Sequence, residues 1–103
     1  MIDMNAAAVN SYTFNAEILP EEDGSVTLSL NEIDLTENGS DMQEAIKKLA
    51  NGILEYAEDY YAFFPTWSKA PNRKPHLPYV LKALIINDIP TIIGLIKCHP
   101  GKI

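Results

Sequence analysis

The sequence predicts an α+β fold: a small antiparallel sheet of three to four strands, one long amphipathic helix packed on it, and a short C-terminal helix. Apolar and polar residues alternate from Tyr12 to Ile18 and again from Val26 to Leu30, a period of two that is typical of half-buried strands. Between Asp41 and Phe64, apolar residues instead recur every three or four positions, as in a helix that covers such a sheet. The expected order is β-β-β-α-β-like.

The first two strands are predicted to form a hairpin. The run Glu21-Glu22-Asp23-Gly24 lies between them, and Gly24 can take the positive φ that a tight turn needs. After the hairpin the alternation changes phase, so we expect a bulge or bend at Asn31-Glu32. A short third strand is then predicted near Ile33 to Thr36.

The helix between Asp41 and Phe64 has the strongest pattern in the chain. Ser40 and Gln43 match the S-x-x-Q capping box that opens many helices. Pro65 is expected to end the helix, because the residue before a proline is disfavoured in helical conformation. The apolar stripe consists of Met42, Ala45, Ile46, Leu49, Ala50, Ile53, Ala57, Tyr60 and Tyr61.

The remaining third of the chain gives weaker signals. Four prolines between residues 65 and 78 predict an ordered or semi-ordered loop. The run Tyr79 to Ile86 fits a strand or a helix by periodicity, and we favour a strand for its latter part. Asp88 is expected to cap a last helix that runs through Cys98, with Pro90 in the first turn, where proline is tolerated.

Composition limits the class of protein. A length of 103 residues allows one domain, predicted over residues 11–103 after a flexible leader at residues 1–10. The single cysteine cannot form an intrachain disulfide, and the sequence has neither a positively charged leader nor an unbroken apolar stretch of membrane-spanning length. We therefore expect a soluble cytoplasmic protein with no membrane partner. Its net charge of −6 disfavours general binding to nucleic acid.

The charges are unevenly distributed along the chain. Residues 1–60 hold 13 acidic and 2 basic side chains, whereas residues 61–103 hold 1 acidic and 6 basic. The simpler interpretation is that the strands and the helix have solvated acidic faces. The alternative is that the acidic half docks a basic partner.

No motif for catalysis, metal binding or a cofactor is present in the sequence. Cys98 and His99 are adjacent, and no G-x-S-x-G elbow or glycine-rich phosphate loop accompanies them. The histidines and the cysteine show no chelating spacing. We therefore predict no enzymatic activity, no metal and no cofactor. His76 is expected to pack on the domain as a loop residue, and Cys98 to be either a small buried apolar group or an unreactive surface thiol.

A cluster of aromatic rings precedes a short basic segment. The rings are Tyr56, Tyr60, Tyr61, Phe63, Phe64 and Trp67. Together with Lys69, Arg73 and Lys74, these rings fit a single-stranded RNA or DNA site, where bases stack on aromatics and cations neutralise phosphates. The favoured interpretation is that the rings close the core where the helix ends.

The region from Tyr12 to Tyr60 resembles the HicB-like antitoxin family. The resemblance lies in the run Thr13 to Ile18, the turn Glu22 to Gly24, the strand Ser25 to Leu30, and the segment Asn38 to Ile46. It implies a small β-β-β-α-β layer that neutralises a small basic ribonuclease toxin without catalysis. Members of that family also carry a helix-turn-helix or ribbon-helix-helix module for operator DNA. Residues 63–103 lie outside the pattern, and no separate DNA-binding module is expected here.

The resemblance and the charge distribution together define the expected contact surface. Its carboxylates cover the basic RNA-binding face of the toxin by steric and electrostatic complementarity. The expected contacts are Glu21, Glu22, Asp23, Glu32, Asp34 and Glu37, supported by Trp67. The length of the apolar helix also allows a homodimer, because a second subunit could cover part of its stripe.

Overall fold

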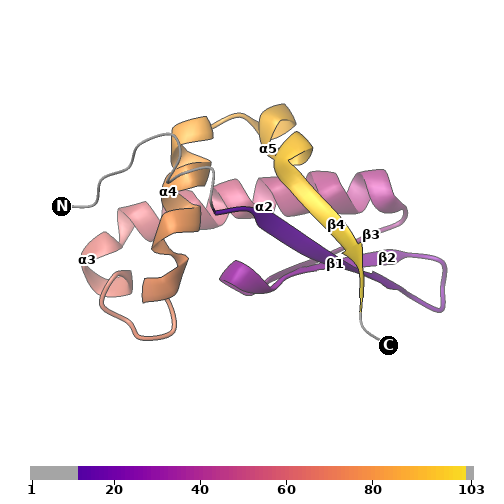
Figure 1. Cartoon of the computed structure of the whole chain (residues 1–103), viewed down its shortest axis with the longest axis horizontal. Coiled ribbons are helices and arrows are strands. Elements are labelled where there is room, and N and C mark those ends of the chain that lie inside the picture. Colours follow the sequence, from indigo (N-terminus) through magenta and orange to yellow (C-terminus); the bar gives the residue numbers. More distant parts are fainter. Residues whose placement is uncertain (1–11, 102–103) are drawn as a thin grey trace.

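The computed structural model describes residues 12–101, so the predicted leader at residues 1–10 lies outside the described part of the chain. It contains four strands, four α-helices and two single turns of 3-10 helix (Figure 1). In chain order these are β1 (Phe14–Pro20), β2 (Val26–Leu30), η1 (Asn31–Ile33), β3 (Leu35–Gly39), α2 (Met42–Ala62), α3 (Phe64–Trp67), η2 (Lys74–His76), α4 (Leu77–Ile86), α5 (Ile89–Leu95) and β4 (Ile96–Pro100). The predicted α+β class is confirmed.

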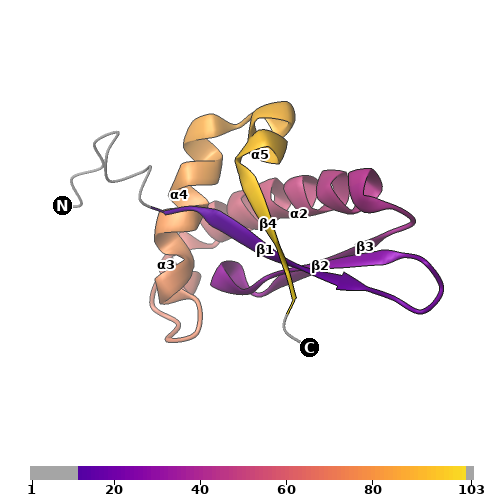
Figure 2. The same cartoon turned by 45° about the vertical axis from the view of Figure 1, so that its right-hand side comes forward.

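The four strands form one sheet in the order β3-β2-β1-β4. The predicted hairpin is present: β1 and β2 pair antiparallel with Ala16 opposite Leu30, and β3 continues antiparallel beside β2. The fourth strand differs from the antiparallel sheet that we predicted, because β4 runs parallel to β1 with Phe14 opposite Ile96. A parallel pair needs a long crossover, which α2 to α5 provide (Figure 2).

The core lies between the sheet and α2. Phe14, Ala16, Leu28 and Leu30 project from the first two strands and are fully buried. The facing side of α2 is also buried, and it contains Ala45, Leu49, Ala50, Ile53, Ala57 and Tyr60. These are six of the nine predicted stripe residues. Tyr61 departs from the prediction, because 71% of it is exposed at the end of the helix.

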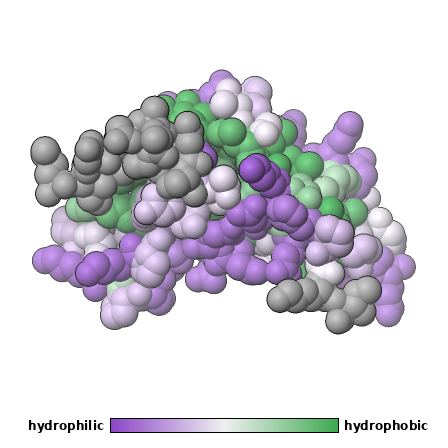
Figure 3. All heavy atoms as spheres, viewed as in Figure 1, coloured by the Kyte–Doolittle hydropathy of each residue, from purple (hydrophilic) through white to green (hydrophobic). Residues whose placement is uncertain are grey.

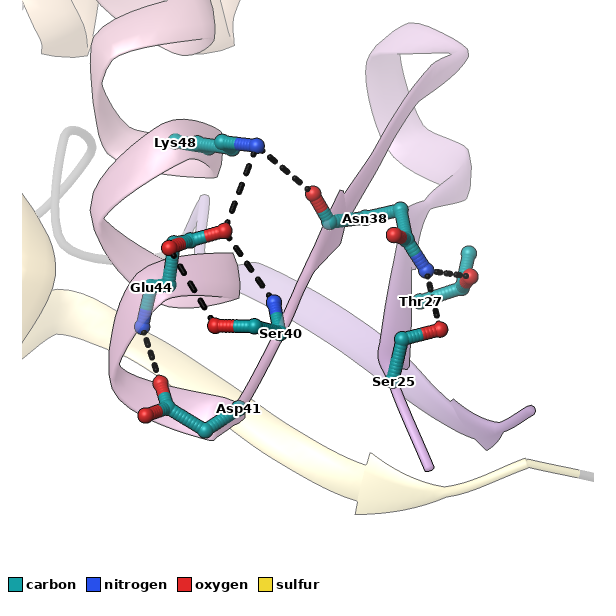
Figure 4. A network of polar contacts seen from close by, with 7 residues as sticks. All are labelled: Ser25, Thr27, Asn38, Ser40, Asp41, Glu44 and Lys48. Atoms are coloured by element: carbon teal, nitrogen blue, oxygen red, sulfur yellow. Dashed lines mark hydrogen bonds and ion pairs between the residues drawn. The ribbon is translucent and has the colours of Figure 1, made fainter. Parts of the chain in front are cut away.

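The turn from β3 into α2 is fixed by a polar network (Figure 4). We predicted Ser40 as the cap, but Asp41 holds that position and its carboxylate accepts from the Glu44 amide at 2.8 Å. Glu44 Oε1 reaches back to the Ser40 amide at 3.1 Å, so the reciprocal bonding of a capping box is displaced by one residue. Lys48 pairs with Glu44 and donates to the Asn38 carbonyl of the edge strand β3. This contact occupies one backbone carbonyl of the edge strand, a group of the kind through which edge strands pair with other chains.

The break after β2 is a single 3-10 turn and not a simple bulge. Residues Asn31–Ile33 form η1, and Asp34 follows with a φ of 56°. This left-handed conformation redirects the chain, so β3 starts at Leu35 and extends to Gly39, later than the predicted third strand.

The prediction for Tyr79 to Ile86 was wrong: the segment belongs to helix α4. The predicted loop is also partly helical, because Pro65, Pro75 and Pro78 each occupy the first turn of a short helix or 3-10 turn. Proline is tolerated there because its missing N–H would have no partner within the helix. The prolines between residues 65 and 78 therefore start helices and do not only mark a loop.

The last helix is shorter than predicted. Asp88 does cap it, accepting from the Thr91 amide at 2.9 Å, but α5 ends at Leu95 and not at Cys98. From Ile96 the pattern has a period of two, since Ile96 and Cys98 face the core while Lys97 and His99 are exposed. This alternation makes the segment the strand β4.

One lysine is buried within α4. Lys82 is 4% exposed, and its Nζ donates to the Tyr12 carbonyl at 2.6 Å. Burial lowers the pKa of this amine, and Lys97 adds to the effect.

Within residues 12–101, no helix combines the length and apolar character needed to cross a membrane.

Candidate functional site

The β1–β2 turn presents three consecutive carboxylates. Glu21, Glu22 and Asp23 are all exposed at this tip, at one end of the long axis of the molecule (Figure 1). The turn is held by bonds from the Glu21 amide to the Ser25 carbonyl and from the Gly24 amide to the Glu21 carbonyl. Asp23 accepts from the Ser25 hydroxyl at 2.6 Å and from its amide at 2.9 Å, which lowers the pKa of Asp23. These three residues therefore form an ordered, exposed group of acidic side chains, which we call the acidic tip.

The other predicted acidic contacts do not join the acidic tip in one surface. Glu32 is half-buried and accepts from the Asn15 amide at 3.1 Å and from its side chain at 3.0 Å, so it ties η1 to β1. Glu37 lies on the face of the sheet that α2 covers, and its carboxylate is next to Gly52 of that helix. Asp34 lies at the far end of β2 from the tip.

Asp34 belongs to a cluster at the corner where the sheet meets the helices. Its carboxylate lies 3.5 Å from His76 Nε2, and Tyr56 Oη lies 2.5 Å from His76 Nδ1. A neutral imidazole with its proton on Nε2 satisfies both contacts, donating to Asp34 and accepting from the tyrosine. The three groups line a hollow of about 390 Å³ together with Ile33, Leu35, Asn72 and Arg73.

Arg73 joins the aromatic rings to this corner. Its guanidinium lies 4.0 Å from the centre of the Trp67 ring and 5.4 Å from that of Tyr56. Tyr60 donates to the Arg73 carbonyl at 3.1 Å. Tyr56, Tyr60 and Trp67 thus close the end of the core with Arg73, as the favoured interpretation predicted, whereas Tyr61, Phe63 and Phe64 are exposed. Lys69 and Lys74 of the predicted nucleic-acid site remain exposed, and Trp67 is half-buried.

His76 packs on the domain as predicted, with 6% of its surface exposed. Burial lowers its pKa below the ordinary value of about 6.5. The Asp34 carboxylate acts in the opposite direction, but that side chain is 79% exposed, so water screens its attraction for an imidazolium. The buried ring is therefore neutral near pH 7.

We expect protonation of His76 to destabilise the fold. Because its pKa is lower in the folded state, the unfolded chain binds more protons between the folded pKa and about 6.5. The free energy of unfolding should thus fall as the pH drops below about 6.5. Denaturant titrations at several pH values between 5 and 7.5 should show this loss in the wild type and not in H76Q, whose side chain does not titrate. An equal slope in both proteins would contradict the assignment.

The remaining thiol and imidazole are placed apart from the corner. Cys98 packs against the core, and burial raises the pKa of its thiol, so it stays protonated and unreactive. His99 lies on the open face of the sheet, with Nε2 3.2 Å from Asn15 Oδ1. In the view of Figure 3 the surface over the sheet is hydrophilic, and hydrophobic residues gather in the upper part of the view. Among residues 12–101, no group of three or more His, Cys, Asp or Glu side chains is placed to hold a metal ion.

The corner was not predicted from the sequence as a unit. Asp34 follows η1, whereas Tyr56 lies in α2 and His76 in η2, and successive members of the group are at least 20 positions apart in the sequence. The sequence did single out Asp34 and Trp67 as partner contacts and Arg73 as a nucleic-acid contact. The structure brings these three together around Tyr56.

These features define a small α+β protein that presents charged groups at its surface around one sheet-and-helix core. Residues 2–98 match the model of the PHD-like family, described as "Antitoxin of toxin-antitoxin, RelE / RelB, TA system". The chain therefore belongs to this family of antitoxins. The antitoxin part of the predicted resemblance is confirmed, whereas the HicB-specific part stays a prediction.

A solved structure supports the same assignment. The chain is 37% identical to an antitoxin part of a proposed toxin/antitoxin system from Syntrophomonas wolfei subsp. wolfei, and the two superpose with a TM-score of 0.83. The match covers 92% of this chain and 68% of that one. No protein of curated function matches the sequence.

Proposed function

We propose that this antitoxin neutralises a small basic toxin, such as a ribonuclease, by covering the toxin's RNA-binding face. The observation that supports this most directly is the acidic tip, where Glu21, Glu22 and Asp23 are exposed together on an ordered turn. Preformed like charges attract an oppositely charged surface and speed association without an ordering cost. The mechanism is steric and electrostatic, and it assigns no catalytic role to the chain. We place the encounter in the cytoplasm.

The corner supplies a second contact in this proposal. Asp34 is exposed at the mouth of the 390 Å³ hollow, and the Tyr56 ring forms part of the lining. A carboxylate beside an aromatic face suits an arginine or lysine side chain, which gains both an ion pair and a cation–π contact. Arg73 also lines the hollow, and its positively charged guanidinium already lies against Trp67 and Tyr56. Asp34 is therefore the group that would select a cation.

Glu32 and Glu37 have smaller roles in the proposed surface than the sequence suggested. Both are half-buried, and Glu32 Oε1 already accepts two hydrogen bonds from Asn15. The other oxygen, Glu32 Oε2, is buried inside the domain, so a toxin side chain cannot reach it directly. The proposed contacts are consequently the acidic tip and Asp34, with Trp67 supporting the corner.

The test is affinity purification of the tagged chain from its source cells, with mass spectrometry of the proteins retained. We expect a stoichiometric partner of basic pI that is toxic when expressed alone. A chain that is recovered alone would contradict the proposal.

The alternative site for single-stranded nucleic acid on Lys69, Arg73 and Lys74 predicts RNA binding that weakens steeply with salt and is lost in the R73A/K74A double variant.

A further inference from the structure

Strand β3 has one side that no other strand of the described chain pairs with. It is the first strand in the sheet order β3-β2-β1-β4, so β2 occupies its other side. The backbone groups of successive residues point to opposite sides of a strand, and the bond from the Glu21 amide to the Ser25 carbonyl fixes this alternation in the hairpin. Continued across β2, the same alternation turns the N–H and C=O groups of Thr36 and Asn38 to the open side.

The contacts of Asn38 agree with this direction (Figure 4). Its carbonyl accepts from Lys48 Nζ of α2 at 3.2 Å, whereas its side-chain amide donates to Ser25 and Thr27 of β2 at 3.0 Å each. Within residues 12–101, no hydrogen bond uses the Asn38 amide or the two backbone groups of Thr36. We call the outward backbone groups of Thr36 and Asn38 the β3 edge.

The opposite edge of the sheet offers fewer donors. The bond from the Gly101 amide to the Ile18 carbonyl sets the alternation of β4. The residues turned outward are then Ile96, Cys98 and Pro100. The Ile96 amide already donates to carbonyls of α5, and proline has no N–H. In the described part of the chain, β4 therefore offers one outward amide, that of Cys98, whereas β3 offers two.

The β3 edge connects the two contacts that we propose for the toxin. At one end, Asn38 lines a hollow of about 510 Å³ together with the three residues of the acidic tip. At the other end, Leu35 lines the hollow at the corner beside Asp34. The strand between these ends has five residues, which span about 16 Å at about 3.3 Å per residue. A toxin that contacts both ends therefore lies along the β3 edge.

A groove between β3 and α2 has room for the side chains of an added strand. Its volume is about 570 Å³, and its lining includes Glu37, Lys48 and Gly52. The missing side chain of Gly52 leaves space for the Glu37 carboxylate, which lies 3.3 Å from the position of a Cβ there. This carboxylate makes no hydrogen bond or ion pair with another described residue, so it suits a lysine or arginine of the added strand as a secondary contact.

A second copy of this chain fits the β3 edge poorly. In a two-fold antiparallel pair, Thr36 of each copy has to lie opposite Asn38 of the other for both residues to bond. This register places the two Glu37 side chains directly opposite each other, where like charges are destabilising. A strand with a basic side chain at that position replaces the repulsion by an attraction. The charges therefore favour the basic toxin as the occupant.

We infer that the toxin adds an extended segment of about five residues to the β3 edge and so continues the sheet of the antitoxin. The inference rests on the proposed function and specifies how the toxin is held. Main-chain hydrogen bonds supply affinity in this mode, and side chains at alternate positions supply specificity. Lys48 has to leave the Asn38 carbonyl, and 51% of its side chain is exposed, so it is free to turn into water.

The first test is amide hydrogen exchange, followed by NMR on the labelled full chain, alone and saturated with the co-purified partner. We expect the Thr36 and Asn38 amides to exchange about 10-fold more slowly or less in the complex, because each gains a main-chain bond. The Glu37 amide should change less, since Glu37 already pairs with Leu28 in the free chain. Unchanged exchange at Thr36 and Asn38 in a saturated complex would overturn the inference.

The second test compares T36P with T36A by calorimetry. Proline removes the outward amide without removing a bond to β2, and edge strands tolerate it at such positions. We expect T36P to bind the partner about 10-fold more weakly or worse. T36A loses the same side chain but keeps the amide, so its affinity should stay within a few-fold of the wild type. Circular dichroism verifies that T36P folds, and exchange in the wild type decides the matter if it does not.

The outcomes separate this inference from the proposed function. If charge reversal at the acidic tip weakens binding but T36P binds as tightly as T36A, the toxin contact stands and the added strand is wrong. If the chain is recovered from its source cells without any partner, both are wrong.

Discussion

The double variant E21K/E22K is expected to bind the toxin about 10- to 100-fold more weakly than the wild type at low salt. Each substitution removes an attraction and adds a repulsion on an exposed side chain of the acidic tip. Asp23 is kept, because its carboxylate holds the turn through Ser25. Isothermal titration calorimetry with the co-purified partner measures the change directly. The difference should shrink as salt is raised, since exposed charges are screened.

The matched control for this prediction is E55K/D59K. Both residues are exposed on α2, and the pair changes the net charge by the same amount as E21K/E22K. We expect its affinity for the toxin to stay within a few-fold of the wild type. If both double variants lose affinity equally, total charge and not the acidic tip governs binding. If neither does, the toxin contacts another surface.

The second large effect is expected at Gly39, where β3 turns into α2. A Cβ at this position would lie 2.3 Å from the Ala45 amide nitrogen and 2.8 Å from its Cα. Both atoms are backbone of α2, so the clash cannot be relieved by a side-chain rotation. We expect G39A to lower the free energy of unfolding by about 3 kcal/mol, at the upper end of typical overpacking costs. Denaturant titration followed by circular dichroism measures this.

Gly94 provides the control for Gly39. It lies in α5, and among the described residues no atom beyond its chain neighbours and the backbone of its own helix lies within 4 Å of a Cβ built there. Alanine is the better helix former, so G94A should stabilise the protein by about 0.5 to 1 kcal/mol. Substitution by alanine is thus predicted to lower the free energy of unfolding at Gly39 and to raise it at Gly94. Equal effects at both positions would contradict the packing at the β3–α2 turn.

The first half of the fold was predictable because its patterns are local. The alternation in Phe14–Pro20 and Val26–Leu30 matches the observed burial, and so does most of the period in Met42–Ala62. Each of these elements buries one face only, which is the condition under which hydrophobic periodicity is informative. The helix cap moved by a single residue, from Ser40 to Asp41, because both side chains can accept the bond.

The second half was less predictable, for reasons visible in α4 and β4. Residues Leu77–Ile86 are apolar on two faces, so their sequence does not distinguish a buried strand from a helix. Pro78 was the available signal, since a proline there suits the first turn of a helix. Strand β4 pairs with β1 about 80 residues away, a non-local contact that no short pattern specifies. The corner of Asp34, Tyr56 and His76 is non-local for the same reason.

The measurement that tests the central claim most directly is a growth assay with the co-purified partner. Expression of that partner alone should arrest growth, and co-expression of this chain should restore it. The E55K/D59K variant should restore growth as the wild type does, whereas E21K/E22K should restore it poorly. Full protection by E21K/E22K, produced at the same level as the wild type, would contradict neutralisation through the acidic tip.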